Sequence, residues 1–243
     1  MTKTAAPMTS GSIWKQMTFF AMPIFLGNLF QQLYNTVDSL IVGNFLGSSA
    51  LAAVSSSGSL IFMLIGFLSG ISAGAGVIVA RFFGAGDEKN LQRAVHTTVA
   101  FGLVAGVLMT GVGVALSPQI LRWMDTPESV MRESVTYLQI YFAGSLGFVM
   151  YNVLVGILQA VGDSRHPLYY LIVSSVINLV LDLLFITGFH TGVGGAAVAT
   201  VISQIVSALL CFWQLLRTKE SYGLKIRKIR FDKGILVQII KIG

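Results

Sequence analysis

The amino-acid sequence predicts an all-α membrane protein, a bundle of six transmembrane helices. Of its 243 residues, 54% are hydrophobic and only 11% are charged, and the mean hydropathy is +0.78. A soluble globular domain carries about 25% charged residues, so this chain has too little polar surface to cover itself in water. Its long apolar runs also lack the alternation of apolar and polar residues that is typical of transmembrane strands.

Six apolar runs are each long enough to cross the bilayer as a helix, which takes about 20 residues. A helix satisfies its own backbone hydrogen bonds inside lipid, so six such runs predict a helical bundle. The predicted spans are residues 17–43, 51–80, 94–116, 134–161, 168–189 and 194–216. The first run is too long for a cleavable signal peptide, and we expect it to remain as the first span.

Two segments follow from this pattern. Residues 1–217 are predicted to form one six-helix transmembrane lobe. Residues 218–243 are predicted to form a basic cytoplasmic loop and, from residue 233, the start of a seventh helix. Because this last run is too short to cross about 30 Å of hydrocarbon, we expect the sequence to be truncated there.

Lysine and arginine are distributed unequally between the ends of the predicted bundle. Thirteen lie in the amino-terminal tail and in the second, fourth and sixth loops; the alternate loops hold Arg122 and Arg132, and Lys241 lies in the final apolar stretch. Cytoplasmic loops carry an excess of Lys and Arg. We therefore expect a multi-pass protein of the cytoplasmic (inner) membrane with its amino terminus in the cytoplasm. The net charge of +6 then reflects contact with anionic headgroups and requires no nucleic acid.

Polar side chains recur at helical spacing inside three of the predicted spans. Steps of three or four residues place such side chains on one face of a helix. The stripes are Asn28, Gln31, Asn35 and Asp38 in the first span; Ser174, Asn178 and Asp182 in the fifth; and Thr200, Ser203, Gln204 and Ser207 in the sixth, with Asn152 in the fourth. They predict a shared, water-accessible cavity. Alternatively they hold the helices together through interhelical hydrogen bonds of about 1 kcal/mol or less each.

Asp38 and Asp182 are the two carboxylates that lie well inside the apolar runs. An aspartate at the bilayer centre costs roughly 2.5–3.5 kcal/mol on insertion scales. No Lys or Arg lies within the predicted spans to pair with either acid. We therefore expect Asp38 and Asp182 to bind a proton, a metal cation or a cationic substrate.

Pro23, near the start of the first span, is a candidate hinge, with a passive kink as the alternative. The histidines and the cysteine form no catalytic or metal-binding pattern. His96 is expected at the start of the third helix, His166 and His190 fall in loops, and Cys211 stands alone. The sequence therefore predicts no enzyme activity and no cofactor.

Four segments resemble the multidrug and toxic compound extrusion (MATE) family. PIFLGNLFQQLYNTVDSLIVGNFLGSSALAAV at residues 23–54 resembles its first helix and following loop, and LQAVGDSRHP at 158–167 resembles the end of its fourth helix. NLVLDLLFI at 178–186 and GVGGAAVATVISQ at 192–204 are similar to its fifth and sixth helices. In combination, the resemblance extends from about residue 14 to the end of the sequence.

The resemblance implies one lobe of a transporter with twelve helices in two lobes around a central cavity. Such transporters export organic cations and other amphiphilic compounds, driven by entry of sodium ions or protons. The implied coupling-ion or proton site, which could hold Na⁺, consists of Asp38, Asn178, Asp182 and Thr200. The stripes add Gln31, Asn35, Asn152, Ser174 and Gln204 as expected cavity-lining residues.

The family has two lobes, and this sequence resembles the amino-terminal one. The missing carboxy-terminal lobe implies either a fragment or a half-size protein that pairs with a second chain. The expected function is cation-coupled antiport of a small amphiphilic or cationic substrate across the lipid bilayer. An alternative is a flippase for lipid-linked oligosaccharide or peptidoglycan precursor, which requires cationic cavity side chains that the six runs lack. A non-transporting scaffold is a third alternative, and the two unpaired acids disfavour it.

Overall fold

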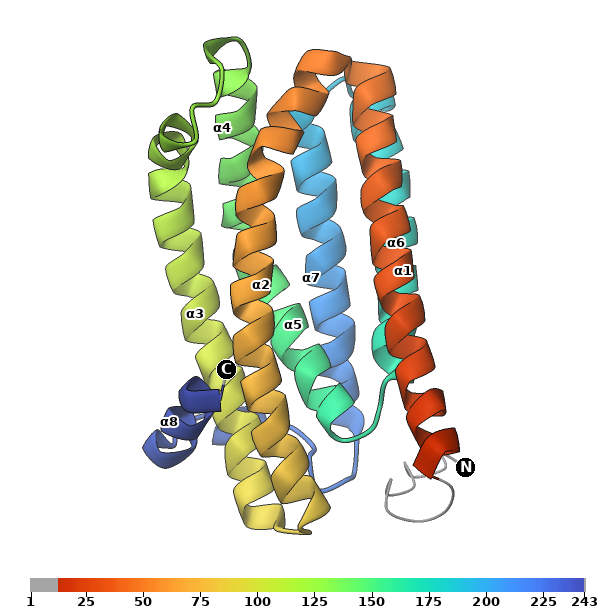
Figure 1. Cartoon of the computed structure of the whole chain (residues 1–243), viewed down its shortest axis with the longest axis vertical. Helices are drawn as coiled ribbons and strands as arrows, with labels where there is room; N and C mark the ends of the chain where they lie inside the picture. The colour runs from red at the N-terminus through yellow and green to blue at the C-terminus, as the bar shows by residue number, and fades with distance from the viewer. Residues whose placement is uncertain (1–12, 243) are drawn as a thin grey trace.

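The chain folds into a bundle of long helices that run side by side (Figure 1). The computed structural model describes residues 13–242, which are mostly helical and contain no strand. The helices are α1 (Ile13–Leu46), α2 (Ser48–Gly84), α3 (Glu88–Trp123), α4 (Glu128–Ala143), α5 (Ser145–Ala160), α6 (Arg165–Leu183), α7 (Val193–Arg217) and α8 (Lys233–Ile242). A π-helical turn, Leu184–Gly188, follows α6, and a 3₁₀ turn, Ile226–Lys228, precedes α8.

This architecture is that of a multi-pass membrane protein, as predicted. Among the described helices, α2, α3, α7 and α6 with its π-helical turn are each long and apolar enough to cross a membrane, and α4 with α5 makes a fifth such unit. α1 spans 34 residues but falls outside this apolar group. Its amide and carboxylate side chains lower its hydropathy, which is why the number of strongly apolar spans is smaller than the six predicted.

The predicted fourth span, residues 134–161, is wrong as one continuous helix. It consists of the ends of α4 and α5, which are bent by 50° relative to each other on either side of Gly144. A Cβ atom at Gly144 would overlap the side chain of Val201, so α7 packs directly against the backbone of this joint. The hydroxyls of Ser145 and Thr110 also lie 3.0 Å apart, which ties the joint to α3. Apolar periodicity gives no sign of such a contact.

The predicted fifth span, residues 168–189, is regular only to Leu183. The chain then widens into the π-helical turn Leu184–Gly188. Thr191 closes this region, because its backbone N–H and its hydroxyl both donate to the carbonyl of Phe185. π-Helical turns are rare and occur frequently at functional sites. Here the irregularity begins two residues after Asp182.

The largest buried apolar cluster joins α2, α3, α5, α7 and α8. Side chains such as Ile78, Leu154 and Cys211 are fully buried or nearly so within it. α8 docks onto this cluster through Ile235 and Ile239. α1 lies at the edge of the bundle beside α6 (Figure 1). The bundle is therefore most tightly packed away from α1, and α1 bounds a looser polar interior.

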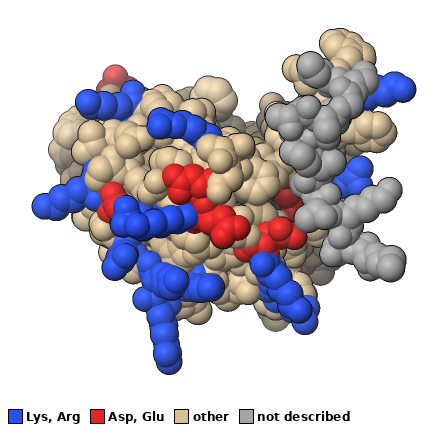
Figure 2. Space-filling model, turned by 90° about the horizontal axis from the view of Figure 1, so that it is seen from below, with Lys and Arg blue, Asp and Glu red and all other residues tan. Residues whose placement is uncertain are grey.

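The start of α1, the α2–α3 and α5–α6 turns, and the segment between α7 and α8 all lie at the same end of the bundle (Figure 1). The segments and helix ends at this end of the bundle carry twelve of the thirteen basic residues, and the remaining one, Lys3, lies outside the described residues. Viewed onto this end, Lys and Arg side chains project around the perimeter, while Asp and Glu gather toward the middle (Figure 2). The charge asymmetry read from the sequence therefore corresponds to one physical face of the protein.

Substitution of Gly144 tests the close contact between the α4–α5 joint and α7. We expect Gly144→Ala to destabilise the protein by about 1–3 kcal/mol, because the added methyl must displace Val201 or the backbone of α7. Gly111→Ala on α3 is the matched control, since an added Cβ there meets no atom within 4 Å. Thermal unfolding in detergent measures both. Equal melting temperatures for the two variants would contradict the contact.

Candidate functional site

A polar pocket of about 540 Å³ opens inside the bundle. Its wall is formed by side chains from six helices, α1, α2, α4, α5, α6 and α7. Most of the residues singled out in the sequence border it: Pro23, Asn28, Gln31, Asn35, Asp38, Asn152, Thr200 and Gln204. The polar stripe of α1 is therefore turned toward an interior space, which explains how a membrane helix carries so many amides.

Asp38 of α1 and Asp182 of α6 meet beside this pocket. Their carboxyl groups lie close to each other. Asp182 is fully buried, and one oxygen of each acid, Oδ1, is buried without a hydrogen-bond partner among the described residues. Two carboxylates at this separation repel each other unless a proton or a cation lies between them. The pair therefore has the chemistry of a cation or proton site.

Asn178 and Thr200 position Asp182. With the Asn178 amide oriented to satisfy both neighbours, Nδ2 donates to Oδ2 of Asp182 at 2.7 Å, and Oδ1 accepts from the backbone N–H of Thr200 at 3.1 Å. Asn178 lies one turn before Asp182 on α6, whereas Thr200 belongs to α7. The amide thus links two helices and fixes one carboxylate oxygen, which leaves the other available to a ligand.

The unpartnered oxygens suit a hard cation or a proton. Hard cations bind oxygen atoms, and carboxylates are their usual protein ligands. The hydroxyl of Thr200 donates to the carbonyl of Ala196 at 3.0 Å, and its lone pairs still face the site. A sodium ion would therefore draw its protein ligands from Asp38, Asp182 and the Thr200 hydroxyl, with Asn178 acting through Asp182.

Ser174 is the predicted cavity residue that the structure does not bring to the pocket. It is buried, and its hydroxyl donates to the carbonyl of Leu171 at 2.9 Å within α6. Asn152 does border the pocket, and its amide also donates to the carbonyl of Phe148 at 2.9 Å. Gln204 keeps a buried Oε1 atom without a partner among the described residues. It adds a free acceptor to the pocket wall.

Three tyrosines contribute to the site and were missed from the sequence. Tyr34, Tyr137 and Tyr141 all line the pocket, and the Tyr34 hydroxyl lies near Thr200. The rings of Tyr137 and Tyr141 stack with centroids 6.4 Å apart and an interplanar angle of 22°. The sequence did contain a sign of their position: Tyr34 falls on the polar face of the first span, and Tyr137 and Tyr141, four residues apart, share one face of their helix. Aromatic faces attract cations.

A multi-pass bundle with an interior polar pocket and an acidic pair is the architecture of one lobe of a membrane transporter. Residues 23–184 match the model of the MatE family, and the chain belongs to this family. The resemblance read from the sequence is thereby confirmed.

Known proteins of this family match almost the whole chain. It is 36% identical over 239 residues to the probable multidrug resistance protein YoeA of Bacillus subtilis, covering 96% of this chain and 52% of that protein. It is 26% identical over 233 residues to the multidrug export protein MepA of Staphylococcus saprophyticus, covering 96% of this chain and 51% of that protein.

The fold also matches a solved structure. A crystal structure of MATE in the bent conformation superposes with a TM-score of 0.88 at 27% identity, covering 96% of this chain and 52% of that one. The chain thus spans about half the length of these relatives and corresponds to the amino-terminal lobe.

The acidic pair predicts an unusual response to substitution. We expect Asp182→Asn to raise the melting temperature in sodium-free buffer at high pH, by about 2–4 °C or more, because it removes the repulsion with Asp38. The new amide can still accept from Asn178. The measurement is thermal unfolding in detergent.

Asp125→Asn is the matched control for this substitution. Asp125 is an exposed loop residue with a φ of 52°, a conformation that Asn also adopts readily, so its melting temperature should be unchanged. A lower melting temperature for Asp182→Asn than for the parent protein would show that the two carboxylates do not repel each other.

Proposed function

We propose that this lobe belongs to a cation-coupled antiporter that exports organic cations or other amphiphilic compounds in exchange for sodium ions or protons. The observation that carries the proposal is the meeting of Asp38 and Asp182 at the edge of a pocket lined by polar and aromatic side chains. The printed names of the relatives, a multidrug resistance protein and a multidrug export protein, support the substrate class.

The position of Asp38 supplies a physical route to exchange. It contributes both to the carboxylate pair and to the wall of the pocket. A cation or proton held between the two acids neutralises the charge that would attract a cationic substrate. A substrate bound next to Asp38 in turn disfavours that ion. Because the ion or proton and the substrate compete for Asp38, release of one favours binding of the other.

The pocket suits a cationic or amphiphilic ligand better than an anionic lipid-linked precursor. Asp38 is the one charged side chain among the described residues that line it. Tyrosine and phenylalanine rings supply apolar area and cation-attracting faces, and amides supply hydrogen bonds. A pyrophosphate group would require cationic partners. The pocket therefore favours the antiporter over the flippase alternative.

Transport further requires a second body. Alternating access in transporters of this kind is the movement of one lobe against another around a fixed site. We propose that the partner is a carboxy-terminal lobe, on the same or a second chain. We also propose that the protein resides in the cytoplasmic membrane with its amino terminus in the cytoplasm. Twelve basic residues of the described segments at that end of the bundle support this orientation.

Asp38→Asn tests the coupling role. In the two-lobe protein we expect this variant to insert normally but to lose ion-driven efflux of a fluorescent organic cation. An amide keeps the shape of the carboxyl group but neither exchanges a proton nor balances a cation. The measurement is efflux from liposomes under separate sodium and proton gradients, which also identifies the coupling ion. Asp125→Asn is the charge-matched control, and normal efflux by Asp38→Asn would remove Asp38 from the mechanism.

The two-lobe requirement has its own test. Cells that express this chain by itself should show no efflux, and co-expression of a matching carboxy-terminal lobe should restore it. A single six-helix body can fold, since its helices satisfy their own backbones, but it has nothing to move against. Robust efflux from the single chain as a monomer by crosslinking would contradict the proposal. Efflux accompanied by a crosslinked homodimer would indicate a half-size protein.

A further inference from the structure

A second pocket, of about 630 Å³, lies far from the acidic pair at the basic end of the bundle. It forms between the first turns of α3 and the segment that connects α7 to α8. Five basic side chains line it, from both sides: Lys89, Arg93, Arg227, Lys228 and Arg230. Glu88 and Asp232 are the acids in its wall. The transport mechanism proposed above uses none of these groups.

The connecting segment is fixed to α3 by hydrogen bonds and is not a loose basic tail. The amide of Gln92 donates to the carbonyls of Ser221 and Gly223, the latter at 3.0 Å. Nε2 of His96 accepts from the backbone N–H of Lys225 at 3.0 Å, and Nδ1 donates to the carbonyl of Gln92 at 2.6 Å. These bonds position the backbone that leads into the basic side chains.

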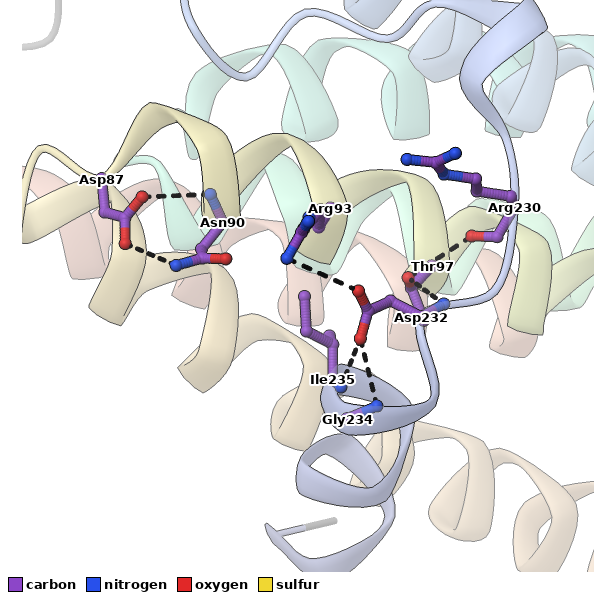
Figure 3. Close-up of polar contacts among 8 residues, drawn as sticks. All are labelled: Asp87, Asn90, Arg93, Thr97, Arg230, Asp232, Gly234 and Ile235. Carbon is purple, nitrogen blue, oxygen red and sulfur yellow. Dashed lines mark hydrogen bonds and ion pairs between the residues drawn. The ribbon is translucent and has the colours of Figure 1, made fainter.

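Thr97 makes the last attachment of this segment. Its buried hydroxyl accepts from the backbone N–H of Asp232 at 3.1 Å and donates to the carbonyl of Arg230 at 3.4 Å (Figure 3). Arg93 from α3 and Arg230 from the segment thereby lie on either side of Thr97 (Figure 3). The two arginines line the same pocket, which is formed by contacts between residues more than 130 positions apart in sequence.

Of the two acids in the pocket wall, Asp232 is largely occupied by other contacts. Oδ1 of Asp232 accepts from the backbone N–H groups of Gly234 and Ile235 at 3.1 and 3.2 Å, which caps α8 (Figure 3). Its Oδ2 forms a long ion pair with Arg93, at 3.9 Å (Figure 3). Asp87, just before α3, accepts from Asn90, and these hydrogen bonds lower the pKa of its carboxyl (Figure 3). The pocket therefore keeps an excess of unneutralised positive charge.

The depth of the pocket matches the level of lipid headgroups. On α3 the exposed apolar side chains begin at Leu103 and continue through Val107 and Leu108. Leu103 lies six residues beyond Thr97, which is about 9 Å along the helix axis. α8, which continues from the pocket, exposes Val237 and Ile240. Basic side chains thus sit directly below an apolar surface, at the perimeter of this end of the bundle (Figure 2).

We propose that this pocket binds the phosphate headgroup of an anionic phospholipid from the adjacent leaflet. The guanidinium groups of Arg93 and Arg230 would contact the phosphate, and Lys89 and Lys228 would add point charges at the rim. The acyl chains would lie along the apolar surface of α3 that begins at Leu103. A prebuilt pocket distinguishes this site from the diffuse attraction of a polybasic loop to a negative membrane.

The test uses the purified two-lobe protein in phosphatidylcholine nanodiscs that contain a photoactivatable phosphatidylglycerol. We expect crosslinks in the peptides that contain residues 88–97 and 226–232, and competition by unlabelled phosphatidylglycerol. Lys89→Gln with Lys228→Gln should weaken binding roughly tenfold or more. The control is Lys219→Gln with Lys225→Gln, which removes the same charge from exposed positions of the same segment outside the pocket. This pair should change binding less than twofold.

A charge-neutral variant separates a built pocket from general attraction. Thr97→Val removes both hydroxyl contacts and leaves the net charge unchanged, so we expect weaker phosphatidylglycerol binding with the protein still folded by thermal unfolding. Equal effects of the two lysine pairs, with no effect of Thr97→Val, would overturn the proposal in favour of nonspecific attraction. Efficient displacement by millimolar inorganic phosphate would overturn it in favour of a soluble anion. Each outcome is independent of transport activity.

Discussion

The interaction on which this structure depends is the approach of two carboxyl groups, from Asp38 and Asp182, inside a bundle surrounded by hydrocarbon. Charge inside a membrane is costly, and two like charges add their repulsion to that cost. The surrounding features reduce it. The polar face of α1 borders the pocket next to Asp38, and Asn178 donates to Asp182 while it accepts from α7. The described residues that line the pocket supply no positive charge, and the proposed function assigns that role to a transported ion or proton.

The acidic pair is held in place because some helices of the bundle pack closely against each other, while others leave space for the pocket. α7 passes directly over Gly144, where the α4–α5 joint is bent by 50°, and this contact anchors the helix that carries Thr200. The π-helical turn Leu184–Gly188 begins just after Asp182 and ends the regular part of α6. Both irregularities lie near the site, and neither disturbs the apolar cluster formed by α2, α3, α5, α7 and α8. The bundle is thus rigid on one side and open on the other, toward α1.

The basic end of the bundle follows a different physical rule. Its Lys and Arg side chains lie outside the hydrocarbon, where a charged group is not desolvated and can contact anionic headgroups. His96 and Thr97 are buried polar residues near the start of a membrane helix, and both are used to hold the backbone of the segment that leads to α8. This attachment also fixes the start of α8, because Asp232 caps that helix. The path from α7 to α8 is therefore defined by side chains of α3.

The sequence by itself determined the membrane bundle, the family and the faces that bear polar residues, because these follow from local composition, from spacing along a helix and from recognisable motifs. It identified Asp38, Asn178, Asp182 and Thr200 through stripes and resemblance, and the structure brings these four together, while their roles stay predictions. Only the tertiary structure showed that the span 134–161 is broken at Gly144, that the Ser174 hydroxyl turns back onto its own helix and that tyrosines line the pocket. The physical reason is that each of these depends on which helix lies opposite. Such contacts join residues that are distant in sequence, and the periodicity of one helix carries no information about its neighbour.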